Sequence, residues 1–200
     1  MKESLSTLIG NYFFTRYASI KLITELISGL IKVRDVNLTE LAICICEDCK
    51  LESAYRKLQR FFANCSICGV ALAKLLVKLL GIEGENWLLV LDRTNWAFGK
   101  LKINILVLAI CHHGIAVPIL YTMLNNQGGN SNSKDREDML TKFIRIFGSK
   151  RMKGLIADRE FIGDSWLKFL ADQSINFYIR IRADITIGRT ENEPLQLIIK

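Results

Sequence analysis

The spacing of apolar residues changes near residue 85 of this 200-residue chain, and that change constrains its architecture most. Before it, apolar residues recur at intervals of three and four, which is the period of one face of an α-helix. After Gly81-Ile82-Glu83-Gly84 they form short runs separated by turn residues, as buried strands do. We therefore predict an all-helical region over residues 1–84 and a sheet-containing unit over residues 85–200.

The first 84 residues are expected to form four amphipathic helices. Residues 7–30 form the first, and Asn37-Leu38-Thr39-Glu40 has the residues of a capping box, so a second helix should begin there. The third covers Leu51–Phe62. The fourth ends at Gly81, because glycine commonly stops a helix.

Three cations lie on the third of these helices, away from its apolar stripe: Arg56, Lys57 and Arg60. Such a group is either a solvated helix face or a surface that contacts phosphates, and the sequence leaves both interpretations open. The whole chain has 27 basic and 20 acidic residues, a formal net charge of +7. That balance favours a polyanionic partner, of which nucleic acid is the commonest.

The second unit has the pattern of three strands, a helix, a strand, a helix and a strand. The second and third strands flank His112-His113-Gly114, a short turn that predicts an antiparallel hairpin. The first helix covers Lys134–Phe147 and the second covers Gly163–Ala171. This order predicts an α/β unit built on a mixed sheet. The five expected strands are Trp87–Leu91, Ile103–Cys111, Ile115–Tyr121, Gly154–Ala157 and Ile175–Ile181.

Two of these strands are followed directly by an aspartate, Asp92 after the first and Asp158 after the fourth. A carboxylate at the end of a buried strand is costly unless it is paired or bound to a cation. Ligands of α/β sheets also gather at the carboxyl ends of strands. The spacing leaves two interpretations open: each aspartate caps a turn or pairs with its neighbour, Arg93 or Arg159, or both converge on one metal site.

The residues around both aspartates resemble a known family. Two segments closely resemble the first and second acidic motifs of bacterial DDE insertion-sequence transposases. They are Leu91-Asp92-Arg93-Thr94-Asn95-Trp96 and Ala157-Asp158-Arg159-Glu160-Phe161-Ile162-Gly163. The resemblance implies a ribonuclease-H-like mixed sheet with flanking helices, preceded by an all-helical DNA-binding region. It also covers Tyr55–Phe62, Asn104–Val107, Gly129–Asn132 and Arg180–Arg182.

The resemblance further implies a reaction, its cofactor and its partners. Members of this family cleave DNA strands and transfer them during transposition, using two Mg²⁺ or Mn²⁺ ions held by carboxylates. Asp92 would bridge both ions and Asp158 would hold one. Arg93, Lys100 and Arg159 would contact backbone phosphates. The expected partner is double-stranded DNA, at the ends of the element and at the target, bound by a homodimer.

The third acidic ligand of the family, a glutamate on a later helix, is not clearly matched. Arg189, Glu193 and Lys200 have the family spacing, but Thr186 stands where a tyrosine belongs. Pro194 directly after the glutamate excludes it from a helix interior. We therefore expect a C-terminally truncated transposase that lacks the final core helix and has impaired catalysis.

The cysteines suggest a different function. Cys46-x₂-Cys49 and Cys65-x₂-Cys68 have the spacing of a four-cysteine zinc site. Zinc there would favour a non-catalytic DNA-binding fragment that regulates transposition. The segment between the two pairs, however, is the family-like helix, which needs no metal to form. We favour buried, reduced cysteines that pack as small apolar residues, without zinc.

We expect neither a signal peptide nor a membrane span. Charged residues interrupt the first 32 positions at short intervals. The most apolar stretch, Ile103–Leu124, is broken by Asn104, His112-His113-Gly114 and Pro118. The expected location is the bacterial cytoplasm, in association with the nucleoid and without a membrane partner.

The first testable prediction is DNA binding without cleavage. With Mg²⁺ or Mn²⁺ and end-sequence DNA, the chain should retard the DNA in a gel but leave both strands intact. The physical reason is that loss of one carboxylate of three weakens metal binding and misplaces the second ion. Robust nicking would show that the third ligand lies within these residues.

Overall fold

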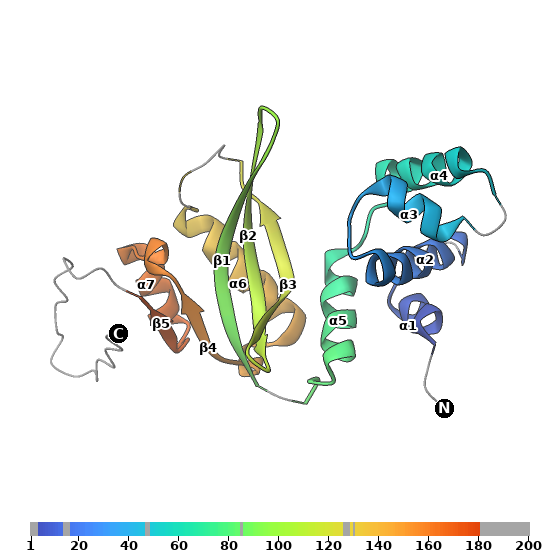
Figure 1. Cartoon of the computed structure of the whole chain (residues 1–200). Helices are drawn as coiled ribbons and strands as arrows, with labels where there is room; N and C mark the ends of the chain where they lie inside the picture. Colours follow the sequence, from blue (N-terminus) through green and yellow to red (C-terminus); the bar gives the residue numbers. More distant parts are fainter. Residues whose placement is uncertain are drawn as a thin grey trace, which may run out of the picture. The chain divides into compact units, whose positions relative to one another are not determined.

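The computed structural model describes residues 4–13, 17–46, 49–84, 86–125, 129 and 131–180. The chain divides into two compact units, Met1–Gly81 and Ile82–Lys200 (Figure 1). No single described helix is long and apolar enough to cross a membrane, although the helices Leu51–Asn64 and Gly69–Leu80 together have that length and composition and are bent by 112° at the break between them.

The first unit is helical throughout its described residues. The helix expected over residues 7–30 is instead two helices, because Phe13 after the first has an extended backbone. Asn37 caps the third helix by accepting a hydrogen bond from the Thr39 N–H at 2.9 Å, as predicted. Gly81 ends the fifth with φ of 70°, a conformation that glycine tolerates best. The elements are α1 (Leu5–Tyr12), α2 (Tyr17–Val33), α3 (Leu38–Ile45), α4 (Leu51–Asn64) and α5 (Gly69–Leu80).

The core around α4 leaves its charged side in solvent. Ala54 and Leu58 are buried against α2 and α3, and Phe61 packs partly against the same cluster. Phe62 lies four residues after Leu58, a spacing that predicts the same buried side of the helix, but it is 58% exposed instead. The face of α4 opposite Leu58 is therefore polar.

The second unit is a five-stranded mixed sheet with the order β3-β2-β1-β4-β5. The first three strands are antiparallel, β4 is parallel to β1, and β5 is parallel to β4. The predicted order of elements and the predicted ribonuclease-H-like fold class are thus confirmed. The hairpin turn falls at His113 and Gly114, both with positive φ. The elements are β1 (Trp87–Phe98), β2 (Leu101–His112), β3 (Ile115–Met123), α6 (Ser133–Phe147), β4 (Met152–Ala157), α7 (Asp164–Asp172) and β5 (Phe177–Ile179), with short 3₁₀ turns η1 (Ser149–Arg151) and η2 (Arg159–Phe161).

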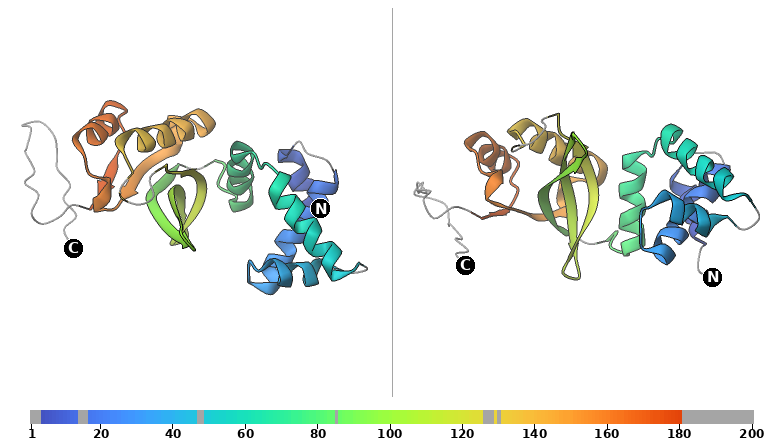
Figure 2. Two further views of the ribbon diagram at one scale, coloured as in Figure 1. Left: turned by 90° about the horizontal axis from the view of Figure 1, so that it is seen from above. Right: turned by 45° about the horizontal axis from the view of Figure 1, so that its top comes forward.

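The two faces of this sheet differ in how they are covered. Both α6 and α7 lie on one side of it (Figure 2). On that side Leu89, Leu108 and Leu155 are fully buried, and Trp87 packs edge to face against Phe143 of α6. Alternate residues point to the other face, which no described element of this unit covers. We call it the open face. Its residues are half-buried or exposed: Leu88, Val90, Ile105, Val107, Tyr121 and Met123.

The difference between the faces can be measured with two matched substitutions in β2. Ile110 on the covered face is 1% exposed, whereas Ile105 on the open face is half-buried. Ile110→Ala should lower the free energy of unfolding by ~3–4 kcal/mol, because it leaves a cavity in a closed core, and Ile105→Ala by ~1 kcal/mol. Urea denaturation measures both. Equal losses would contradict the assignment of the faces.

Candidate active site

Asp92 and Asp158 lie side by side at the end of the parallel ladder between β1 and β4. The last pair of that ladder is Leu91 with Ala157, and the aspartates are the next residue on each strand. Neighbouring strands are ~4.8 Å apart, so the two side chains start about one strand spacing from each other. The register thus puts the two aspartates next to each other, as the interpretation of one shared site requires.

Both aspartates project from the open face. Leu91 and Ala157 are buried on the covered face, and side chains of an extended backbone alternate between faces. Asp158 keeps an extended backbone, with φ of −81° and ψ of 171°. Both aspartate side chains are exposed to solvent. The register therefore brings two accessible carboxylates to one place.

The predicted end of β1 at Leu91 is wrong. The strand continues to Phe98 because β2 keeps pairing with it, from Asp92 opposite Val107 to Phe98 opposite Leu101. On its other side β4 has already ended at Ala157. Asp92 is thus held by a strand on one side only, and its other side faces the position of Asp158.

Each carboxylate is steadied by the backbone that follows it. One oxygen of Asp92 accepts a hydrogen bond from the Arg93 N–H at 2.8 Å, and one of Asp158 accepts from the Arg159 N–H at 2.7 Å. Asp158 therefore caps η2, as one of the two open interpretations predicted. Within the described residues, neither aspartate forms an ion pair with its neighbouring arginine. In the described structure the second oxygen of each exposed carboxylate accepts no hydrogen bond, so it can bind a cation.

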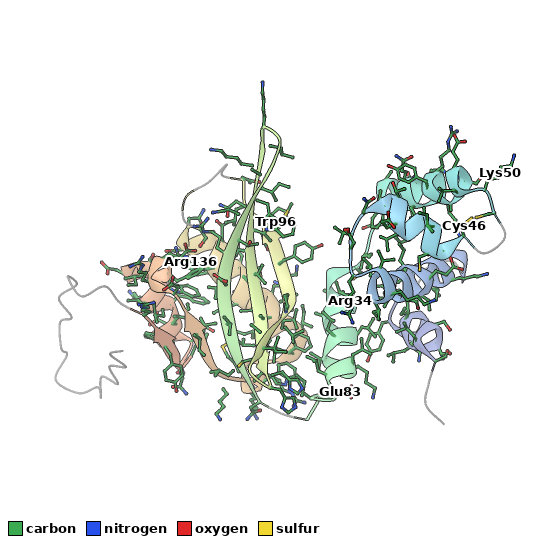
Figure 3. The ribbon with its side chains drawn as sticks, in the orientation of Figure 1. Arg34, Cys46, Lys50, Glu83, Trp96 and Arg136 are labelled. Carbon is green, nitrogen blue, oxygen red and sulfur yellow. The ribbon has the colours of Figure 1, made fainter. Side chains whose placement is uncertain are left out.

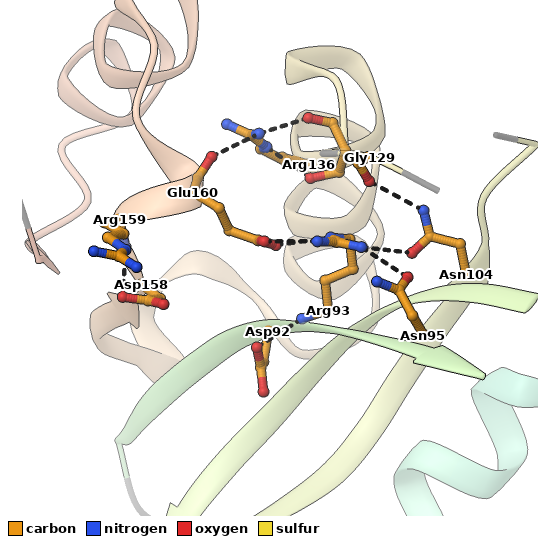
Figure 4. Close-up of polar contacts among 10 residues, drawn as sticks. Asp92, Arg93, Asn95, Asn104, Gly129, Arg136, Asp158, Arg159 and Glu160 are labelled. Carbon is orange, nitrogen blue, oxygen red and sulfur yellow. Dashed lines mark hydrogen bonds and ion pairs between the residues drawn. The ribbon is translucent and has the colours of Figure 1, made fainter. Parts of the chain in front are cut away.

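Arg93 pairs with Glu160 instead of Asp92. Its Nε and Nη2 donate to the two Glu160 carboxylate oxygens, each at 2.9 Å, and Nη1 donates to Asn95 Oδ1 at 2.7 Å and Asn104 Oδ1 at 3.3 Å. The side chains of the ion pair are only 11% and 23% exposed, and Glu160 raises the pKa of Arg93. Figure 4 shows Arg93 and Asp92 on opposite sides of β1. Arg93, predicted to contact phosphate, is thus engaged on the covered side.

A second arginine extends this network to α6. Arg136 is 4% exposed and donates from Nε to Ser131 Oγ at 2.9 Å and from Nη2 to the carbonyls of Ser131 at 2.5 Å and Glu160 at 3.2 Å. Its guanidinium also lies 5.0 Å from the centre of the Phe161 ring. Burial lowers its pKa. Asn104 completes the network by donating to the Gly129 carbonyl at 3.3 Å.

Apart from Arg93, the residues of this network were not identified as functional from the sequence. Glu160 was quoted only as part of the second acidic motif, and Arg136 was not singled out. The sequence nonetheless contained a signal for this network, because the segments that resemble the transposase family include Asn104, Gly129 and Ser131 as well as the two aspartates. In the structure these residues meet through Arg93 and Arg136. The likeness thus extends to the groups that surround the acidic pair.

The remaining predicted basic residues are all exposed. On α4, Arg56 Nη2 lies 2.7 Å from Glu52, Lys57 Nζ lies 3.4 Å from Glu25, and Arg60 donates to the Arg56 carbonyl. These are surface pairs of small energy, which phosphates can replace. Separately, in the second unit, Lys100 lies in the β1–β2 turn and Arg159 in η2, directly after Asp158.

The residues present fit a divalent cation. Mg²⁺ is commonly bound through one or two carboxylates together with substrate phosphates, and Asp92 with Asp158 supplies such a pair. No three His, Cys, Asp or Glu residues converge anywhere in the described part of the chain. Glu193 lies outside the described residues.

Two sulfurs of the cysteine pattern lie together in the structure. Cys46 Sγ and Cys49 Sγ lie 2.8 Å apart (Cys46 is labelled in Figure 3). Neither Cys65 nor Cys68 joins them to make a group of three in the described structure. No disulfide joins any of the six cysteines, all of which lie in the described residues, and Cys49 and Cys68 are exposed. Contrary to the predicted burial, these two are in solvent.

Comparison with known proteins gives structural neighbours of low similarity. No protein-family model matches the chain, and no curated protein matches it in sequence. One neighbour is the HTLV-2 integrase catalytic core domain in complex with magnesium, with 14% identity and a TM-score of 0.37 over 48% of this chain and 61% of that one. Another is the simian T-cell lymphotropic virus intasome in complex with PP2A regulatory subunit B56 gamma, with 13% identity and a TM-score of 0.43 over 82% of this chain and 52% of that one. The chain spans less than two thirds of either neighbour, and the fold assignment here rests on the order and register of its own sheet.

The ion pair between Arg93 and Glu160 can be tested by removing one charge. Glu160→Gln should lower the free energy of unfolding by ~2 kcal/mol, because it leaves a largely buried guanidinium without its anion. Asp138→Asn is the matched control, since its pair with Lys134 at 2.7 Å has side chains 61% and 74% exposed. That change should cost less than ~0.5 kcal/mol. Thermal or urea denaturation measures both changes. Equal stability of the two variants would contradict this account.

Proposed function

We propose that the chain is a DDE-type transposase that cleaves DNA strands and transfers them in insertion-sequence transposition. The observation that carries this proposal is the register that sets Asp92 beside Asp158 with accessible oxygens on an open sheet face. Polynucleotidyl transfer needs carboxylates in this arrangement to hold divalent metal ions. The resemblance of both acidic motifs to such transposases and the net charge of +7 support the same conclusion.

The two aspartates have different neighbours and therefore different proposed roles. Asp92, within a long strand, would be the ligand shared by two Mg²⁺ ions, and Asp158, directly before η2, would hold one of them. Bound Mg²⁺ supplies activation of an attacking oxygen and stabilisation of the leaving oxygen. The Arg93 and Arg159 amides each hold one carboxylate oxygen in place, which leaves the other oxygen available to a cation.

Arg93 and Glu160 act as positioning residues in this proposal. Arg93 directly follows Asp92, and Glu160 lies two residues after Asp158, so their ion pair joins the backbone beside one aspartate to the backbone beside the other. Arg136 holds the Glu160 carbonyl from α6. The network therefore limits movement of η2 relative to β1. A metal site requires such restraint, because its ligands must stay within a fraction of an ångström of their positions.

DNA is the proposed partner of both units. The polar face of α4, with Arg56, Lys57 and Arg60, would contact phosphates of the element's ends. Arg159, directly after Asp158, would contact the strand at the acidic pair, and Lys100, in the β1–β2 turn, would contact it farther along. The protein would act as a homodimer on paired ends in the bacterial cytoplasm. We further propose that catalysis by these residues alone is impaired, because the described residues supply two acidic ligands and Glu160 is already engaged by Arg93.

Binding of Mn²⁺ tests the proposed site without requiring catalysis. Asp92→Asn and Asp158→Asn should each weaken Mn²⁺ binding by at least ~10-fold, since each removes one anionic ligand. Asp164→Asn, at the exposed start of α7, is the matched control and should bind as the unmodified chain does. Titration followed by electron paramagnetic resonance measures free Mn²⁺ directly. Equal affinities for all variants would remove the basis of the proposal.

A further inference from the structure

We propose that the end of the β1–β2 hairpin is a nucleic-acid contact in which Trp96 stacks on a base and two lysines hold phosphates. We call residues 95–104 the ribbon. The inference deepens the proposed function, because it identifies a surface of the second unit that holds the DNA strand near the acidic pair. The inference depends on the proposed function only where it places the DNA relative to Asp92.

The ribbon extends past the rest of the sheet. It pairs internally from Asn95 opposite Asn104 to Phe98 opposite Leu101 and turns at Gly99, which has φ of 60°. The ladder with β4 ends at Leu91, and that with β3 ends at Ile105. No third described strand pairs with the ribbon, and Figure 1 shows it projecting beyond its neighbours.

The ribbon combines an exposed aromatic ring with positive charge. Trp96 is 65% exposed and is labelled in Figure 3, and Leu101 is 62% exposed. Lys100 and Lys102 are also exposed, and residues 95–104 include no aspartate or glutamate. The other two tryptophans of the chain, Trp87 and Trp166, are 3% and 0% exposed. Trp96 is therefore the one tryptophan of the three that is exposed to solvent.

These properties fit a nucleic acid better than a protein surface. Base–aromatic stacking contributes ~1–3 kcal/mol per base, and lysines beside the ring bind the adjoining phosphates. A second ribbon, by contrast, would bring two further lysines against Lys100 and Lys102 without any acidic residue to pair with them.

The ribbon continues the face that carries the first aspartate. Asp92 and Trp96 are four residues apart on one strand, so their side chains lie on the same face about 13 Å apart along it. This distance corresponds to roughly four base-pair steps of ~3.4 Å. A DNA strand with its reacting phosphate at Asp92 therefore reaches Trp96 without bending away from β1. Trp96 would determine how that strand lies across the acidic pair.

Intrinsic fluorescence provides a direct test, because Trp96 is the exposed tryptophan. Titration with a short DNA duplex or single strand, without metal, should quench the emission and shield it from acrylamide, and Trp96→Phe should abolish both effects. Trp96→Ala should weaken DNA binding by ~5–100-fold. Ile115→Ala is the matched control, because Ile115 is 66% exposed at the opposite end of the sheet. Its DNA affinity should be unchanged.

The lysines are tested through the salt dependence of binding. Lys100→Gln with Lys102→Gln should reduce the slope of log K against log salt by about two, because each phosphate contact contributes ~0.9. Lys150→Gln with Lys153→Gln, both exposed at the far end of β4, should leave the slope unchanged. Urea denaturation should show Trp96→Ala within ~0.5 kcal/mol of the unmodified chain, as for a surface change.

Two results would overturn the inference. One is an unchanged DNA affinity and salt slope in the ribbon variants. The other is loss of a dimer in sedimentation by Trp96→Ala with DNA affinity retained, which would assign the ribbon to a second copy of the chain. Mn²⁺ binding separates this failure from that of the proposed function. If Asp92→Asn abolishes Mn²⁺ binding while the ribbon variants bind DNA normally, the metal site stands and the ribbon contact is wrong.

Discussion

The parallel pairing of β1 with β4 is the interaction on which the rest of this structure depends. Leu89 and Leu91 in β1 and Leu155 and Ala157 in β4 are all buried on the face covered by α6 and α7. A shift of one residue would move these side chains into solvent, so burial fixes the register. The same register determines that the residues following Leu91 and Ala157 project to the opposite face. The acidic pair is thus a consequence of how the core packs.

The Arg93–Glu160 ion pair adds a second restraint from the other side of the sheet. A largely buried ion pair contributes little net stability, because desolvation offsets much of the attraction, but it penalises every arrangement that separates its partners. Here such a separation would also move η2 away from β1 and Asp158 away from Asp92. The buried Arg136 strengthens the restraint by holding the Glu160 carbonyl. Core packing and this polar network therefore set the two carboxylates together.

Local sequence patterns predicted most of the fold because they depend on near neighbours. The cap at Asn37, the helix end at Gly81 and the turn at His113-Gly114 all follow from residues within a few positions. The end of β1 was not predicted, because the polar residues after Leu91 resemble a turn and only pairing with distant β2 extends the strand. The partner of Arg93 could not be predicted either, since Glu160 is 67 positions away. The aspartates were found because each follows a fully apolar run.

The central claim is that Asp92 and Asp158 share a divalent cation, and crystallography of the protein soaked in Mn²⁺ tests it most directly. The account predicts an anomalous difference peak on the open face of the sheet, within about 2.5 Å of one carboxylate oxygen from each aspartate. A map with the metal bound to one aspartate alone, or with the two side chains directed to opposite faces, would contradict it.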